Sequence, residues 1–128
     1  MPAPVSGSVL IGDDDAALLR FATKYLTRLG YTVVACRNTA EAWSQFEQRP
    51  AWFSLALIDV TMKEQPGEQL ALRMLAAQSE LRVLLWSGYP FNLEQCQARS
   101  PGRVGFLHKP FTPAMLVDAV QQLLASTA

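Results

Sequence analysis

The sequence predicts an α/β domain in which a parallel sheet is covered by helices on both faces. Short apolar runs, each long enough for one strand, alternate with segments whose apolar residues recur at helical spacing. The run at residues 55–58 is continuously apolar, as a strand buried on both faces requires. Polar residues directly follow four of the runs, where the carboxyl ends of parallel strands form binding sites.

Composition favours one ordered, soluble domain. The chain has 128 residues, half of them hydrophobic, and its 11 basic and 11 acidic side chains cancel. We therefore expect no direct binding to nucleic acid or to a membrane, and the absence of a bilayer-length run or signal pattern predicts a cytoplasmic protein. Cys36 and Cys96 lack metal-ligand spacing, and we expect reduced thiols.

The first half of the chain predicts three strands and two helices. After a disordered leader at residues 1–7, strands are expected at residues 8–11, 31–35 and 53–58. An acidic triplet precedes the first helix and Gly30 ends it, whereas Asn38 and Glu41 form a capping pair for the second. The buried positions expected in these helices are Leu18, Leu19, Ala22, Tyr25, Leu26, Leu29, Trp43 and Phe46.

The second half continues the alternation. A polar loop at residues 60–66 leads to a helix after Gly67, and a strand follows at residues 81–86. A weaker helix is expected at residues 92–99, and a short strand at residues 104–107. Thr112 and Pro113 start the last helix. One domain, at residues 8–126, accounts for this pattern of five strands and five helices.

Four polar groups follow strands and should meet at one edge of the sheet. They are the triplet Asp13-Asp14-Asp15, Asp59, Ser87 and Lys109. Three neighbouring carboxylates repel one another, and Mg²⁺, which prefers oxygen ligands, would relieve that repulsion. Lys109 would balance the cluster and contact a phosphoryl oxygen, and Ser87 could donate a hydrogen bond to another.

Simpler interpretations of the same residues remain open. The triplet could be an acidic helix start with nothing bound, and Asp59 could only cap the next turn. Lys109 could be a solvated turn lysine and Ser87 an ordinary turn serine. His108, the single histidine, is expected to be exposed and structural.

Four stretches together resemble the receiver domain of two-component response regulators. They are residues 9–15, residues 57–62 with Gly67, residues 84–89 and residues 106–111, and the resemblance runs from about Ser8 to Ala125. It implies a flavodoxin-like, doubly wound sheet of five parallel strands in the order 2-1-3-4-5, flanked by five helices.

The resemblance also implies roles for individual residues. Asp59 would accept a phosphoryl group from a histidine kinase or a histidine phosphotransfer protein, and Lys109 and Ser87 would contact the phosphoryl oxygens. Asp14 and Asp59 would bind Mg²⁺ directly, together with the backbone carbonyl of Thr61. Asp13 would interact with the Mg²⁺ ion mainly through a bound water molecule.

Two further positions match the family and two depart from it. Phe106 occupies the position of a switch aromatic, and the Lys109-Pro110 peptide bond is expected to be cis. Lys63 stands where the family usually has proline, and Asp15 replaces a more common glutamate. The run at residues 87–90 resembles receivers attached to hybrid sensor kinases.

The resemblance predicts a phosphorylation-activated signalling switch that is not an enzyme for an external substrate. Its partners would be the kinase or phosphotransfer protein, a downstream effector protein and, on phosphorylation, a second copy of the chain. A Mg²⁺-dependent phosphatase with Asp59 as nucleophile is an alternative, but such enzymes usually have an acidic residue where Thr61 stands. A receiver-like module that binds partners without phosphorylation is the third interpretation.

Overall fold

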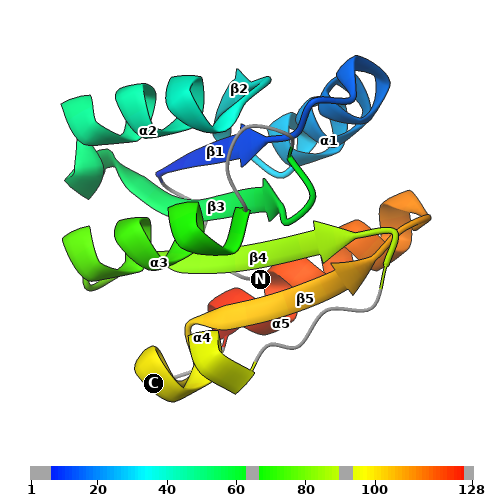
Figure 1. The fold of residues 1–128 in the computed structure, drawn as a ribbon. Coiled ribbons are helices and arrows are strands. Elements are labelled where there is room, and N and C mark those ends of the chain that lie inside the picture. The colour runs from blue at the N-terminus through cyan, green and yellow to red at the C-terminus, as the bar shows by residue number, and fades with distance from the viewer. Residues whose placement is uncertain (1–6, 63–66, 90–93, 126–128) are drawn as a thin grey trace.

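The computed structural model describes residues 7–62, 67–89 and 94–125. Within them, five parallel strands form one sheet in the order β2-β1-β3-β4-β5, which confirms the predicted doubly wound topology (Figure 1). The strands are β1 (Ser8–Gly12), β2 (Thr32–Cys36), β3 (Phe53–Asp59), β4 (Arg82–Ser87) and β5 (Val104–His108). The α-helices are α1 (Ala16–Arg28), α2 (Thr39–Gln48), α3 (Gly67–Ala77), α4 (Glu94–Arg99) and α5 (Pro113–Ala125).

Helices cover both faces of the sheet. One apolar cluster contains buried residues of α2, α3 and α4, and a second contains buried residues of α1 and α5 (Figure 1). Successive residues of a strand point to opposite faces, so Val83 and Leu85 of β4 join the first cluster while Leu84 and Trp86 join the second. The central strand β3 is buried along almost its whole length, as its apolar run predicts.

Local capping explains where the first two helices begin. The Asp15 carboxylate accepts hydrogen bonds from the backbone N–H groups of Ala17 and Leu18 at the start of α1. At α2, the Asn38 side chain accepts from Glu41 N, and the Glu41 carboxylate accepts from Arg37 N. The predicted capping pair is thus confirmed, with the Glu41 carboxylate bound to the residue before the N-cap.

Element boundaries differ from the predictions by about one residue. Tyr31 precedes β2 instead of opening it, while Asp59, Ser87 and His108 are the last residues of their strands. A short 3₁₀ helix at Pro50–Trp52 was not predicted. Predictions for residues 1–6, 63–66, 90–93 and 126–128 lie outside the described residues, including the leader, Lys63 and the start of the weak helix.

Arg103, which directly precedes β5, connects the start of that strand to the end of α3 through hydrogen bonds. Its guanidinium donates hydrogen bonds to the backbone carbonyls of Leu75, Gln78 and Leu81. These carbonyls lie at or just beyond the C-terminal end of α3, where helical partners run out.

Among the described helices, none combines the length and the hydropathy that a membrane span requires.

Candidate functional site

Three carboxylates meet at the carboxyl edge of the sheet. Oxygen atoms of Asp13, Asp14 and Asp59 all lie within 4.8 Å of one another. Asp13 is completely buried and Asp59 is 2% exposed, whereas Asp14 is open to solvent. The predicted convergence of the acidic triplet with Asp59 is therefore present, except that Asp15 is used as the cap of α1.

Backbone hydrogen bonds hold the two buried carboxylates in place. Asp13 follows β1 and donates its N–H to the carbonyl of Cys36 on β2, at 3.0 Å. Its Oδ1 accepts the N–H of Asp15 at 2.8 Å, which turns the chain into α1. Asp59 ends β3, and the next residue, Val60, donates its N–H to the carbonyl of Trp86 on β4, at 3.1 Å.

Lys109 reaches this carboxylate cluster from the end of β5. Its Nζ lies 2.9 Å from Asp13 Oδ2 and 3.4 Å from Asp59 Oδ2. The Lys109 N–H donates to the carbonyl of Ser87 at 2.8 Å, and the Lys109-Pro110 peptide bond is cis, as expected. The sequence could not exclude a solvated lysine here, and the two ion pairs do exclude it.

The pKa values follow from burial and from these ion pairs. Burial is the largest influence on Asp13 and raises the pKa of its carboxyl group, even though Lys109 acts in the opposite direction. Burial alone would lower the pKa of Lys109, but its hydrogen bond to Asp13 and the charges of Asp13 and Asp59 outweigh burial and raise it. Lys109 thus remains a cation that compensates part of the negative charge.

Thr61 orients Asp59 in a way that the sequence did not reveal. The Thr61 backbone N–H and its hydroxyl both donate to Asp59 Oδ1, at 2.8 and 2.7 Å. One carboxylate oxygen is therefore held by Thr61, while Oδ2 is directed towards Lys109. This arrangement is an Asx-type turn, and the sequence signal for it was only a threonine two residues after an aspartate.

Ser87 and Gly67 complete the surroundings of Asp59. Ser87 is buried at the end of β4, and its hydroxyl oxygen accepts the Tyr89 N–H at 3.0 Å. This bond uses the hydroxyl as an acceptor and leaves its own O–H as a donor. A Cβ atom added to Gly67 would lie 2.1 Å from the carbonyl oxygen of Asp59, so the start of α3 approaches the end of β3 more closely than any other residue type would allow.

Phe106 and His108, both on β5, differ in their exposure. His108 is exposed, as predicted, and its ring makes an edge contact with the half-buried ring of Phe106 at 6.3 Å between centroids.

Cys36 and Cys96 are both buried free thiols, and burial raises the pKa of Cys36 to about 12. Neither cysteine belongs to the carboxylate cluster.

Comparison with known proteins agrees with the observed fold. The model of the response regulator receiver domain family matches residues 9–121. The response regulator receiver protein CpdR of Brucella abortus is 30% identical over 91% of this chain and 95% of its own length. The receiver domain of the hybrid histidine kinase CckA superposes with a TM-score of 0.78 at 26% identity, covering 92% of this chain and 99% of that domain.

The chain matches only part of the length of two longer relatives. The chain spans 48% of the response regulator GtcR of Aneurinibacillus migulanus and 25% of the transcriptional regulator NtrC of Azospirillum brasilense, each at 28% identity. A CheY-like receiver domain from Methanospirillum hungatei has the same fold, with a TM-score of 0.81 at 22% identity over 94% of this chain and 95% of its own. This chain therefore belongs to the response regulator receiver domain family, whose members are phosphorylation-activated switches of two-component systems.

Proposed function

We propose that Asp59 is the residue that accepts the phosphoryl group. The observation that supports this proposal most strongly is the geometry of Asp59 itself. It is a buried carboxylate at the end of the central strand, oriented by Thr61 and 3.4 Å from a lysine. The phosphodonor would be a histidine kinase or a histidine phosphotransfer protein, as is usual for the family.

The three carboxylates fit a Mg²⁺ site. Their oxygens are hard ligands, they lie within 4.8 Å of one another, and the exposed Asp14 leaves room for bound water. In this proposal Asp14 and Asp59 bind the ion directly with the backbone carbonyl of Thr61, and Asp13 acts mainly through water. Bound Mg²⁺ would neutralise charge on the phosphoryl group and on the carboxylates.

The transfer itself needs few protein groups. A carboxylate oxygen of Asp59 attacks the phosphorus of the partner's phosphohistidine, an O–P bond forms, the N–P bond breaks, and its electron pair returns to the imidazole nitrogen. Thr61 holds Oδ1 with two hydrogen bonds, which makes Oδ2 the more available nucleophile. Lys109, beside Oδ2, compensates the charge of the phosphoryl oxygens, and the Ser87 hydroxyl, whose oxygen accepts from Tyr89, would donate its own O–H to one of them.

The contact of Thr61 with Asp59 argues against a phosphatase of the aspartyl-nucleophile class. Such an enzyme needs an acid two residues after the nucleophile to protonate the leaving group. Here that position carries a neutral threonine hydroxyl, which donates a hydrogen bond to Asp59 and is too weak an acid to protonate a leaving group at neutral pH. The site therefore supports a switch better than turnover of an external substrate, and the intact carboxylates and Lys109 favour phosphorylation over passive partner binding.

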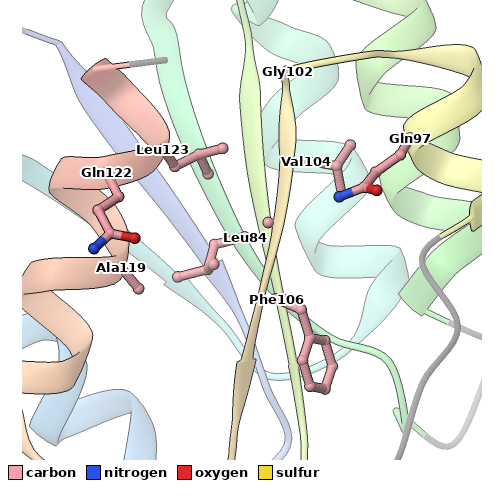
Figure 2. Close-up of a pocket in the computed structure, with 9 residues that line it drawn as sticks. Leu84, Gln97, Gly102, Val104, Phe106, Ala119, Gln122 and Leu123 are labelled. Carbon is pink, nitrogen blue, oxygen red and sulfur yellow. The ribbon is translucent and has the colours of Figure 1, made fainter.

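We further propose that the signal leaves through Phe106. Phe106 is half-buried on β5 and lines a pocket between α4 and α5, which both flank this edge strand. Figure 2 shows Leu84, Ala119, Gln122 and Leu123 on the α5 side of β5, and Gln97, Val104 and Phe106 on the other side. Movement of Ser87 and Lys109 towards a phosphoryl group would reach this surface through the ends of β4 and β5. An effector protein or a second copy would bind there.

Three measurements test these roles. Incubation with acetyl phosphate and Mg²⁺ should add one labile phosphoryl group to the wild type and none to Asp59→Asn. Asp14→Ala should weaken Mg²⁺ binding at least about tenfold, whereas Lys109→Ala should leave it unchanged or improve it. Unaltered affinity in Asp14→Ala would contradict the ligand assignment.

With beryllofluoride, a phosphoryl mimic, NMR signals of Phe106 and α4 should shift. Shifts confined to the loops around Asp59 would exclude this output route.

A further inference from the structure

The edge strand β2 lies at the opposite end of the sheet from Phe106. Its one neighbour among the described strands is β1, and α1 and α2 lie on its two faces (Figure 1). The sequence of β2 is Thr-Val-Val-Ala-Cys, which contains no charged residue, proline or glycine. Natural edge strands commonly carry charged residues or proline to prevent pairing with other chains, and β2 carries neither.

The ladder with β1 determines which backbone groups of β2 face outward. The carbonyl of Cys36 accepts the N–H of Asp13, so the backbone of Cys36 points towards β1. In a parallel ladder, alternate residues direct both N–H and C=O to the same neighbour. Val34 and Thr32 therefore also point towards β1, while Val33 and Ala35 present their N–H and C=O groups to the outside. The N–H of Arg37, in the same alternation, is taken by Glu41.

A shallow hollow accompanies this open edge on the α1 side. It is lined by Leu19, Arg20, Thr23, Lys24 and Ala35. The small side chain of Ala35 leaves the space, and Leu19 gives it an apolar wall, while Arg20 and Lys24 are exposed at its rim. A side chain on an added strand beside Ala35 would enter this hollow and meet two positive charges.

The positive charge of α1 indicates whether a second copy of the chain or a different protein would pair with β2. If two copies paired their β2 strands about a two-fold axis, both α1 helices would lie on the same face of the joined sheet. Helix α1 carries Arg20, Lys24 and Arg28 and has no acidic residue, so like charges would face each other. The basic rim instead complements carboxylates. We propose that β2 receives an extended acidic segment of a partner protein as an additional strand, with its acidic side chains towards α1.

A short peptide in which glutamate alternates with valine is a suitable probe, and the same peptide with lysine in place of glutamate is its control. Isotope-labelled protein titrated with the glutamate peptide should show shifted and exchange-protected amide signals for Val33 and Ala35. Affinity for the glutamate peptide should exceed that for the lysine peptide by roughly tenfold. Shifts located elsewhere, or equal affinity for the two peptides, would overturn the proposal.

Variants separate the backbone contribution from the charge contribution. Ala35→Pro removes one outward N–H without removing a bond to β1, and it should abolish binding of the glutamate peptide. Arg20→Glu should reduce the preference for glutamate by roughly tenfold, whereas Arg99→Glu, the same change on α4 at the other end of the sheet, should leave it within about twofold (Figure 1). Protection of Val33 and Ala35 that rises with protein concentration, without peptide, would identify a second copy as the occupant and contradict the proposal.

Discussion

Replacing Asp59 with asparagine should stabilise the metal-free protein, although it removes the proposed phosphoacceptor. The substitution keeps the size of the side chain and its Oδ1 atom, so the two hydrogen bonds from Thr61 can persist. It removes one of three carboxylate charges that lie within 4.8 Å of one another. The sign of the stability change depends on two opposing contributions. Attraction to Lys109 stabilises the Asp59 charge, whereas repulsion from Asp13 and Asp14 and the cost of burying the charge destabilise it.

The electrostatic contributions can be compared from the distances. At an effective dielectric constant of about 20, attraction between Asp59 and Lys109 at 3.4 Å is roughly 5 kcal/mol. Repulsion from the buried Asp13, at no more than 4.8 Å, is at least roughly 3.5 kcal/mol, and the exposed Asp14 adds about 1 kcal/mol or less after screening. These contributions nearly cancel, so the cost of burying the Asp59 charge decides, and we expect a gain of about 2 kcal/mol in Asp59→Asn.

Urea unfolding in the presence of a chelator measures this gain, and thermal unfolding should show a midpoint higher by roughly 7 °C. Saturating Mg²⁺ should then stabilise the wild type by about 2.7 kcal/mol at a hundredfold excess over its Kd, but the variant much less. Asp118→Asn is the matched control, because Asp118 is an exposed carboxylate on α5, and it should change stability by no more than about 0.5 kcal/mol. An Asp59→Asn protein less stable than the wild type in chelator would refute the reasoning.

Three other perturbations test individual contacts, two of them away from the carboxylate cluster and one beside it. The Tyr31 hydroxyl is buried without a hydrogen-bond partner in the described part of the chain, so Tyr31→Phe should raise the free energy of unfolding by about 1 kcal/mol in urea titrations. Burial also raises the pKa of Tyr31 to about 12, so wild-type stability should fall as pH rises from about 10 to 12, and Tyr31→Phe should lose that part of the fall. Arg103→Met should lower the free energy of unfolding by about 2–3 kcal/mol, because three backbone carbonyls lose their donor. Arg103→Lys should recover only part of this loss. If both variants were as stable as the wild type, the role of Arg103 would be contradicted. Gly67→Ala should cost about 2 kcal/mol or more and weaken Mg²⁺ binding measured by calorimetry, since its Cβ would overlap the carbonyl of Asp59, and normal binding would show that the loop simply adjusts.

The sheet and the position of its carboxylates could be predicted because both depend on local patterns. A continuous apolar run ending in Asp59 predicts a buried strand with its carboxylate at the binding edge, and the structure has that arrangement. The pairing of Asn38 with Glu41 is equally local, since capping involves residues three apart. The strand order came from the resemblance to receiver domains, because alternation alone does not determine it.

What could not be predicted depends on contacts between distant parts of the chain or on loop geometry. Lys109 and Asp13 are separated by 96 positions, and no local pattern distinguishes a lysine in such an ion pair from a solvated one. The two hydrogen bonds from Thr61 to Asp59 require a particular turn after β3. Arg103 resembles any polar loop residue until the end of α3 is brought next to it.

Identification of the phosphorylated residue tests the central claim most directly. An aspartyl phosphate is an acyl phosphate, so borohydride reduces it to homoserine and leaves unmodified carboxylates unchanged. Protein treated with acetyl phosphate and Mg²⁺, reduced in this way and analysed by peptide mass spectrometry should contain homoserine at position 59 alone. Homoserine at position 13 or 14 with Asp59 unmodified, or complete absence of reduction product from folded protein with bound Mg²⁺, would contradict the account.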